Sequence, residues 1–290
     1  IRRLLDDIVA HVAGSDRPDA DPAVLGLVRT LLALGLDLVE HPDRSMGWDH
    51  TDVGLLQSIG RLSGAIAGAI DTASVSEPEL HDPMHRPGGV FLDIGTGTGW
   101  LAIAIARTFP DLRVVGIDLF EPALDLARRN IAGAGATNIE LLEGTLEQIP
   151  LPDRTVDVII SNCVINLSAD KDRVLAEAFR VLKPGGRFAV SDVVVRGTVP
   201  DEVRQHMLLW VGCIAGALEE TDYAAKLVRA GFKDVSLEPT RVYDVEDARA
   251  FLSGQGLDVD ALAAQVQGKF MSAFIRATKP AACCASGCCS

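Results

Sequence analysis

The segment most informative about architecture is Val90-Phe91-Leu92-Asp93-Ile94-Gly95-Thr96-Gly97-Thr98-Gly99-Trp100. Three apolar residues and an aspartate lead into alternating glycines, and an apolar-periodic segment begins at Leu101. This order predicts a buried strand, a tight turn and the N-terminus of a helix, where a ligand can approach bare backbone and N–H donors. A glycine-rich turn alone is a weak signal, because many nucleotide-binding folds use one.

Two details of this segment narrow the class of ligand. The glycines are spaced G-x-G-x-G rather than G-x-G-x-x-G, and Asp93 stands directly before the turn. An unpaired carboxylate there would repel a pyrophosphate, whereas it suits the cationic amino and sulfonium groups of S-adenosylmethionine (SAM). The segment therefore favours SAM, with five candidate cofactor-binding residues: Asp93, Gly95, Thr96, Gly97 and Gly99. A turn without a ligand and a nicotinamide-dependent dehydrogenase are the less favoured alternatives.

Composition argues against several partners. Of 290 residues, 48% are hydrophobic, which is enough for a sizeable core, and the net charge is −13. Such an acidic chain is a poor match for nucleic acid or for an anionic membrane surface. The apolar run Val24–Val39 is interrupted by Arg29 and Asp37, so no run is expected to span a membrane. The chain also turns acidic too early for a usual signal peptide. We therefore expect a cytoplasmic protein without nucleic-acid or membrane partners.

The six cysteines are placed unevenly. Cys163 and Cys213 stand alone, none precedes them, and four crowd the end of the chain: Cys283, Cys284, Cys288 and Cys289. A secreted disulfide scaffold distributes its cysteines through the fold. This placement instead indicates reduced thiols with a chemical or metal-binding role. The alternative for any single cysteine is a small buried apolar residue.

The chain divides into three expected regions: an N-terminal helical region with a linker (1–86), a main domain (87–280) and a flexible cysteine-rich tail (281–290). Apolar periodicity predicts helices over Leu4–Val12 and Val24–Val39, and Thr51 is expected to cap a third. Residues 74–89 hold three prolines and two adjacent glycines, which predicts the linker. The N-terminal region either covers a cofactor cleft or serves packing or oligomerisation.

From Val90 onward, apolar strands alternate with helical segments. The expected strands are Val90–Ile94, Arg113–Asp118, Ile139–Glu143, Val156–Ser161 and Arg187–Val194, followed by Lys233–Leu237 and Gly268–Ala277. Near-continuous apolar strands between helices indicate a parallel sheet covered on both faces. The expected fold class is α/β and Rossmann-like, with a seven-stranded, mostly parallel sheet whose last strand is antiparallel at the edge.

The carboxyl ends of these strands supply the remaining cofactor candidates, because ligands of open α/β sheets bind there. Asp118 ends the second strand, 23 residues after Gly95, where a carboxylate can accept hydrogen bonds from both ribose hydroxyls. The other candidates are Leu119, Leu146, Glu147 and Asn162. Leu146 and Glu147 are expected to meet the adenine, and the backbone at Asn162 the methionine part of the cofactor.

Over residues 88–195, these strand ends resemble class I SAM-dependent methyltransferases, which implies that fold and an enzyme of that class. The chain lacks the N/D-P-P-Y/F turn typical of enzymes that methylate amino groups of bases. Instead, about residues 139–290 resemble arsenite methyltransferases. The segments that carry this resemblance are S-N-C-V-I-N-L-S (161–168), W-V-G-C-I-A-G-A-L (210–218), R-A-F-L (249–252), G-K-F-M-S-A-F (268–274) and the paired tail cysteines.

The resemblance implies methyl transfer from SAM to trivalent arsenic, as arsenite or methylarsonous acid, with Cys163 and Cys213 as arsenic ligands in the catalytic site. The chemistry agrees, since trivalent arsenic is thiophilic and thiolates are the soft ligands of proteins. Thiolates leave the arsenic lone pair exposed, so it can attack a methyl group without a base. The four tail cysteines are further candidate ligands. Arsenic detoxification with a thiol reductant, such as glutathione or thioredoxin, is the implied setting.

One departure from the family concerns the N-terminal third. Arsenite methyltransferases usually carry a further arsenic-binding cysteine before the glycine-rich turn, and residues 1–162 contain none. A two-thiol site suits a methylated trivalent arsenical better than arsenite itself. Two other functions therefore stay open: a methyltransferase for a small organic metabolite with structural cysteines, and a metalloid-binding protein without turnover.

Overall fold

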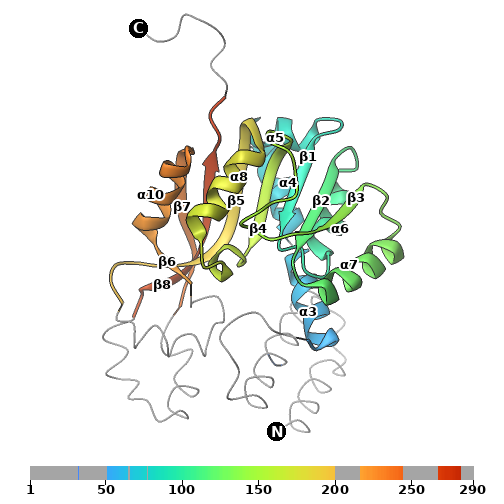
Figure 1. Cartoon of the computed structure of the whole chain (residues 1–290), viewed down its shortest axis with the longest axis horizontal. Coiled ribbons are helices and arrows are strands. Elements are labelled where there is room, and N and C mark those ends of the chain that lie inside the picture. The colour runs from blue at the N-terminus through green and yellow to red at the C-terminus, as the bar shows by residue number, and fades with distance from the viewer. Residues whose placement is uncertain are drawn as a thin grey trace, which may run out of the picture.

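The computed structural model describes Leu32 and residues 51–64, 66–76, 78–199, 216–243 and 267–281. Apart from Leu32, the helices expected over Leu4–Val12 and Val24–Val39 lie outside these residues, as do Cys213 and the four tail cysteines. The described part is organised around a central sheet with helices on both faces (Figure 1).

The described sheet has eight strands. In chain order they are β1 (Val90–Ile94), β2 (Arg113–Asp118), β3 (Ile139–Glu143), β4 (Val156–Asn162), β5 (Leu182–Val195), β6 (Leu218–Glu219), β7 (Lys233–Val242) and β8 (Phe270–Thr278). Seven of them follow the order β3-β2-β1-β4-β5-β8-β7, and β6 pairs with the end of β5. The pairs among β1 to β6 are parallel, whereas β8 runs antiparallel to both of its neighbours. The mostly parallel α/β sheet is thus confirmed.

The bounds of the first four strands match the sequence prediction to within one residue. β5 begins earlier than predicted, because residues 182–186 are also part of the strand. There, Gly185 N donates to Lys279 O at 2.8 Å, and Lys279 N donates to Gly186 O at 2.9 Å. The chain after β8 therefore extends the pairing into this segment.

Two other strand predictions were wrong. The last strand in the chain, β8, lies between β5 and β7 rather than at the edge of the sheet. Most of its apolar residues are buried, whereas β7, the true edge strand, is mostly exposed. The eighth strand, β6, was missed because two residues are too few to show any periodicity.

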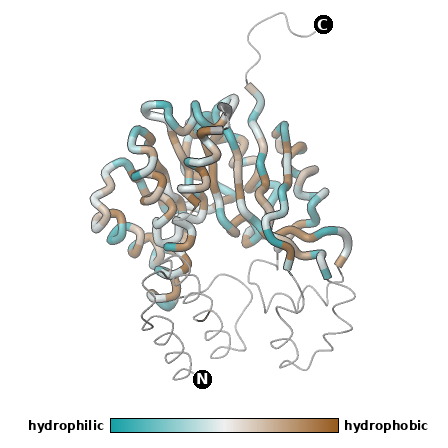
Figure 2. The backbone as a smooth tube through the Cα atoms, turned by 180° about the vertical axis from the view of Figure 1, so that it is seen from behind, coloured by the Kyte–Doolittle hydropathy of each residue, from teal (hydrophilic) through white to brown (hydrophobic). Residues whose placement is uncertain are grey.

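Two helical layers bury opposite faces of the sheet. Strand side chains alternate between the faces, so Phe91 and Val114 belong to one apolar cluster and Leu92 and Val115 to the other. The cluster that contains Phe91 packs under α4 (Ile66–Ser76), α5 (Pro78–His85) and α6 (Trp100–Thr108), and α7 (Glu121–Ala134) lies beside α6. The cluster that contains Leu92 packs under α8 (Lys171–Val181) and α10 (Glu220–Ala230). Figure 2 shows the hydrophobic residues concentrated along the central strands. Both faces are therefore core, as the continuous apolar strands predicted.

The expected linker before β1 is largely helical, so that prediction was wrong. α4 continues to Ser76 and α5 begins at Pro78, where a proline is compatible with the first turn of a helix. Upstream, α3 (Val53–Ser63) begins one residue later than expected. Its N-cap is Asp52 rather than Thr51, and the Asp52 carboxylate accepts a hydrogen bond from Leu55 N at 2.7 Å.

One helical stretch of the described chain, Val53–Val75, is long and apolar enough to cross a membrane by length and composition alone. The expectation that no run spans a membrane stays a prediction. Alanine raises the mean hydropathy of this stretch without giving it a bulky apolar surface. Its inward side chains, Leu56 and Ala67 among them, are buried, and a helix that packs on a core passes the same test.

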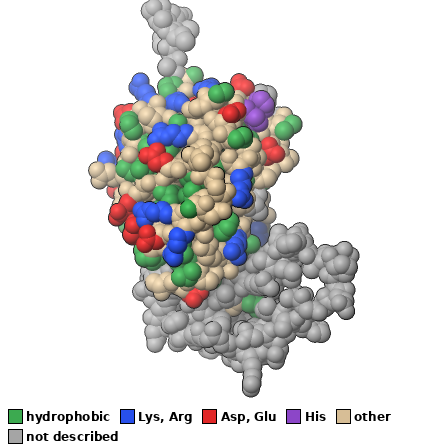
Figure 3. Space-filling view, turned by 90° about the vertical axis from the view of Figure 1, so that its right-hand side faces the viewer, with side chains coloured by type: hydrophobic (Ala, Val, Ile, Leu, Met, Phe, Trp, Pro, Cys, Tyr) green, Lys and Arg blue, Asp and Glu red, His purple; other side chains and the backbone are tan. Residues whose placement is uncertain are grey.

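Charged side chains of both signs are interspersed over the face seen in Figure 3. A typical group is on α7, where Arg128 contacts both Glu121 and Asp125 at 2.7 Å. Such pairing leaves no broad field of one sign on that face. The expectation that nucleic acid is not a partner stays a prediction.

Candidate functional site

The glycine-rich turn joins β1 to α6 at the carboxyl edge of the sheet. Gly95, Gly97 and Gly99 have φ angles of +71°, +53° and +79°, in the left-handed region that favours glycine. A Cβ at Gly95 would lie 2.4 Å from Val164 Cγ2, whereas a Cβ at Gly97 would meet no atom within 4 Å. Close packing therefore requires Gly95, and Gly97 leaves open backbone that a ligand can approach.

Asp93 shapes this turn from inside the protein. Its side chain is 2% exposed, and its Oδ2 accepts a hydrogen bond from Thr96 Oγ1 at 2.7 Å. Burial raises the pKa of Asp93 to about 7, against the effect of hydrogen bonds from Thr96 and the Ala102 backbone. The carboxyl group is thus hydrogen-bonded within the protein, whereas the prediction from sequence was an unpaired carboxylate. A cationic cofactor nearby would favour its ionised form.

Asp118 connects the end of β2 to the turn. Its Oδ2 accepts from Gly97 N at 2.8 Å, and its Oδ1 accepts from Phe120 N at 2.9 Å. Ile117 O accepts from both Gly95 N and Thr96 N at 2.9 Å, so the two strand ends are held together by backbone as well. Leu119 follows and is 60% exposed.

The loop after β3 carries the two predicted adenine contacts, and they lie in different surroundings. Leu146 is 8% exposed and belongs to the apolar cluster under α8, so its side chain faces the core. Glu147 accepts a hydrogen bond from Ser168 Oγ, and its backbone oxygen accepts from Arg173 Nε at 3.0 Å. The loop is thus tied both to α8 and to the segment that follows β4.

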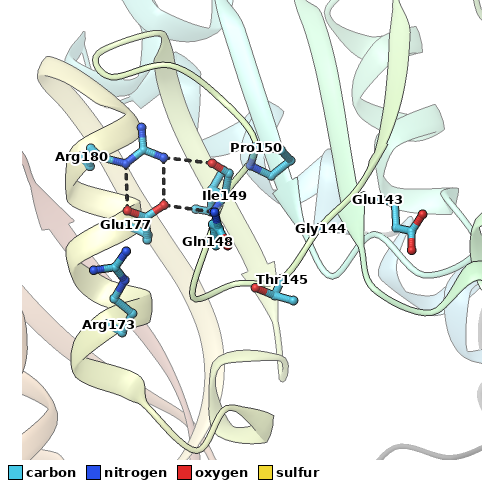
Figure 4. Close-up of a pocket in the computed structure, with 9 residues that line it drawn as sticks. All are labelled: Glu143, Gly144, Thr145, Gln148, Ile149, Pro150, Arg173, Glu177 and Arg180. Atoms are coloured by element: carbon cyan, nitrogen blue, oxygen red, sulfur yellow. Dashed lines mark hydrogen bonds and ion pairs between the residues drawn. The ribbon is translucent and has the colours of Figure 1, made fainter.

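A cavity of about 580 Å³ lies between this loop and α8. Figure 4 shows Glu177 and Arg180 of α8 reaching the backbone of Ile149. Glu177 accepts from Ile149 N at 3.0 Å, and Arg180 donates to Ile149 O at 2.9 Å and to Leu151 O at 2.8 Å. Hydrogen bonds from Arg180 lower the pKa of Glu177, so the pair stays ionised and fixes the loop.

Cys163 follows the last residue of β4 and lies beside the glycine-rich turn. Its backbone has φ +58°, an uncommon conformation for a residue with a side chain, and its N–H donates to Ser191 O at 2.7 Å. The next residue, Val164, is the one that packs on Gly95. The half-buried Cys163 is therefore held at the same edge as the cofactor candidates.

Cys213 lies outside the described residues, but Gly216, three residues later, is within them. A Cβ at Gly216 would lie 1.8 Å from the backbone oxygen of Asn166. Asn166 itself stands three residues after Cys163 and is held by its Nδ2, which donates to Val193 O at 2.8 Å. The segments that carry the two isolated cysteines thus meet where only glycine fits.

A buried polar cluster lies behind this meeting point. Asp192 is 1% exposed, and its Oδ2 accepts from the hydroxyl group of Tyr223 at 3.3 Å. Burial raises the pKa of Asp192 to about 8, partly offset by Tyr223 and by the charge of Lys171. The Oδ1 atoms of Asp192 and Asn166 are buried without a hydrogen-bond partner. Buried polar atoms without a hydrogen-bond partner destabilise the folded state, so this cluster lowers the stability of the protein.

The structure brings most of the predicted residues to one edge of the sheet. Asp93 and Asp118 contact the turn, Cys163 directly precedes Val164, which packs on Gly95, and Asn162 lies at the end of the adjacent strand. Val164 and Gly216 were not predicted as site residues, because they contribute through packing contacts that have no sequence motif. Among the described residues, no group of three or more His, Cys, Asp or Glu side chains could hold a metal ion.

Comparison with known proteins gives a consistent result. The model of the methyltransferase domain family matches residues 85–234. The arsenite methyltransferase of Halobacterium salinarum is 35% identical over 239 residues, which cover 80% of this chain and 58% of that protein. A ubiquinone/menaquinone biosynthesis C-methyltransferase of Geobacter sulfurreducens is 41% identical over 109 residues, which cover 36% of this chain and 42% of that protein.

Among solved structures, an arsenic(III) S-adenosylmethionine methyltransferase from Chlamydomonas reinhardtii superposes with a TM-score of 0.54 at 31% identity. The match covers 68% of this chain and 64% of that one. The likeness to arsenite methyltransferases extends upstream of the predicted stretch 139–290, since 239 residues align. The chain spans 43–58% of the arsenite methyltransferases it matches. It belongs to the methyltransferase domain family, has the class I SAM-dependent methyltransferase fold and resembles arsenite methyltransferases.

Proposed function

We propose that the chain is a SAM-dependent methyltransferase that methylates trivalent arsenic bound by Cys163 and Cys213. The observation that carries this proposal is the contact of Gly216 with Asn166, which brings together the segments bearing the two cysteines. In the sequence, Cys213 stands three residues before Gly216, and Cys163 stands three residues before Asn166. The likeness to arsenite methyltransferases supports the same assignment.

The residues at the carboxyl edge fit SAM. Open backbone at Gly97 provides room for close approach, Asp118 has carboxylate oxygens beside it, and the exposed Leu119 offers an apolar contact for adenine. Asp93 and Thr96 hold the turn in shape, and a negative Asp93 would favour the sulfonium charge. When bound, SAM supplies an electrophilic methyl group. We assign the remaining predicted contacts of the site to Gly95, Gly99, Leu146, Glu147 and Asn162.

The chemistry required of the protein is positioning. Cys163 and Cys213 thiolates would replace oxygen ligands of arsenic and leave its lone pair free. An arsenic–carbon bond then forms as the methyl–sulfur bond of the sulfonium breaks, and arsenic is oxidised from the trivalent to the pentavalent state. No proton is removed in this step, so no base is needed. The protein orients arsenic toward the methyl group and excludes water.

The oxidised product has to be reduced before another methyl group is added. We therefore propose a cytoplasmic setting with a thiol reductant such as glutathione or thioredoxin, in which methylation serves detoxification. The tail cysteines Cys283, Cys284, Cys288 and Cys289 are proposed to capture arsenic or exchange disulfides. The N-terminal region (1–86), the methyltransferase domain (87–280) and the tail (281–290) are the proposed organisation.

A second candidate is a methyltransferase for a small organic metabolite. The 41% identity to a quinone-pathway C-methyltransferase over 109 residues favours it, as does the lack of cysteine in residues 1–162. In that case the thiol of Cys163 is structural, and arsenic does not protect it from alkylation.

One assay separates the candidates. SAM consumption is measured with arsenite and with methylarsonous acid for the full chain, Cys163→Ser, Cys213→Ser and the matched tail variant Cys288→Ser. We expect turnover with methylarsonous acid to exceed that with arsenite, to fall at least about a hundredfold in the first two variants and to persist in the third. Unchanged turnover in both Cys163→Ser and Cys213→Ser would refute the proposal. Tight binding of the arsenical without formation of S-adenosylhomocysteine would indicate a metalloid-binding protein instead.

A further inference from the structure

Helix α3, in the N-terminal region, packs directly on the glycine-rich turn. A Cβ at Gly60 would lie 2.0 Å from Thr98 Oγ1 and 2.9 Å from Trp100 Cδ1. The α3 backbone therefore approaches the turn as closely as a glycine permits. Thr98 is 2% exposed, and the guanidinium carbon of Arg61 lies 5.3 Å from the centroid of the Trp100 ring. The second half of the turn is thus covered and shaped from outside by α3.

Gln57 is the centre of the hydrogen bonds at this contact. Its Oε1 accepts from Trp100 Nε1 at 2.6 Å and from Asn130 Nδ2 at 3.0 Å, and its Nε2 donates to Asn130 Oδ1 at 3.1 Å. Asn130, on α7, also donates to the backbone oxygen of Thr98 at 2.8 Å. The reciprocal pair of amides therefore joins α3, α7 and the turn in one network.

The same helix also reaches the next strand end. Asn162, the last residue of β4, donates from its Nδ2 to Ser63 Oγ at 3.4 Å. α3 thus contacts both the turn and the end of β4, and Gly97 with its open backbone belongs to that turn. A helix in this position can set the distance between two walls of a ligand site.

We propose that α3 is a positioning element of the cofactor site, with Gln57 as its positioning residue. Binding of the cofactor and docking of α3 are then coupled, and the coupling is reciprocal. A cofactor that needs the turn in its observed conformation stabilises the docked helix, and a helix that loses its anchor weakens cofactor binding. The inference rests on the proposed function only for SAM as the ligand, and it is independent of the methyl acceptor.

The test uses binding of S-adenosylhomocysteine to the full chain, measured by calorimetry without turnover. Gln57→Ala is expected to weaken binding about tenfold, because it loses the hydrogen bond to Trp100 beside the turn and the two to Asn130. The matched control is Asn138→Ala. Asn138 Nδ2 contacts three backbone oxygens, at 3.0 to 3.4 Å, but at the opposite edge of the sheet. It is expected to lower the melting temperature and leave the affinity unchanged.

Two further measurements separate positioning from packing. In the double variant Gln57→Ala/Asn130→Ala, the two losses should not multiply, since both residues act through one network. Hydrogen exchange at α3 amides should slow when the wild type is saturated with S-adenosylhomocysteine. Wild-type affinity in Gln57→Ala, or unchanged exchange at α3, would overturn the inference. A wild type that fails to bind S-adenosylhomocysteine would overturn the proposed function, and this inference with it.

Discussion

Replacement of Asp192 by asparagine should stabilise the protein, although it alters a fully buried hydrogen-bonded side chain. Burial raises the pKa of Asp192 to about 8 from 3.8. At pH 7 the unfolded chain holds this group ionised and the folded chain holds it protonated. The difference of about three pH units, at about 1.4 kcal/mol each, gives an unfavourable contribution to folding of about 4 kcal/mol. Asparagine keeps the shape and never ionises, so Asp192→Asn should recover about 2–4 kcal/mol.

The dependence of stability on pH provides the sharper test. A carboxyl group whose pKa is raised on folding stabilises the folded state fully below its unfolded value, and that contribution is lost as pH rises. For Asp93 and Asp192 this loss extends from about pH 4 to about 7 and about 8, respectively. The pKa of Glu177 is lowered on folding, so its contribution to stability is lost as pH falls, but only below the ordinary pKa range of a glutamate. Between pH 5 and 7, the free energy of unfolding should therefore fall as pH rises.

The assay is urea unfolding of the cofactor-free protein at half-unit steps from pH 5 to 8. The wild type should lose about 2–3 kcal/mol per pH unit in the lower half of this range, and Asp192→Asn about half as much. The matched control is Asp157→Asn. Asp157 is also buried, but it is paired with Lys183 at 2.6 Å and Arg86 at 3.2 Å, so this variant should lose stability. Parallel pH profiles for wild type and Asp192→Asn, or a less stable Asp192→Asn at pH 7, would refute the reasoning.

Three other predictions concern packing and anchoring at the site. Gly216→Ala should weaken binding of a trivalent arsenical at least about tenfold, while the affinity for S-adenosylhomocysteine is retained. The control is Gly68→Ala, where a Cβ meets no atom within 4 Å, and parallel titrations should show both affinities unchanged. Asp118→Asn should weaken S-adenosylhomocysteine binding about ten- to a hundredfold by calorimetry, because charge-assisted hydrogen bonds to the backbone are lost; an unaffected affinity would exclude Asp118 from the cofactor site. Arg180→Ala should lower the free energy of unfolding by about 3 kcal/mol in urea, since it leaves the buried Glu177 without its partner; a loss below about 1 kcal/mol would contradict this.

The parallel core of the sheet could be predicted because its strands are buried on both faces. Strands that are mostly apolar, such as Val156–Ile160 with its single aspartate, have few alternatives to a central strand, and the observed bounds agree. The prediction failed where tertiary contacts decide the structure. Prolines at 78 and 83 indicate a linker, yet the segment is helical because α5 packs on α4 and Met84 is buried. The pairing of β6 and the central position of β8 likewise depend on partners distant in sequence.

The candidate site shows the same division. The motif placed Asp93 directly before the turn, and it lies near the end of β1, but the sequence gives no information on its hydrogen bond with Thr96. The network of Gln57 and Asn130 has no sequence signature at all, since two amides 73 residues apart become partners only when α3 docks. Asp192 was missed for a similar reason. It is followed in β5 by three valines, and its role is visible only once Tyr223 of α10 contacts it.

The sheet order explains why a cysteine after β4 was a sound candidate. β4 pairs directly with β1 in register Ile94↔Ser161, so the residues that follow these two strands are neighbours wherever the chain goes next. That neighbourhood is the point where the strand order reverses, and ligands of open α/β sheets bind there. Cys163 therefore reaches the glycine-rich turn through topology, and the contact of Val164 with Gly95 is the result. Cys213 follows β5, one strand further away, and no pairing rule returns it to the turn. Gly216, three residues after Cys213 in the sequence, packs on Asn166, so under the proposed function a single added methyl group there should separate arsenic binding from cofactor binding.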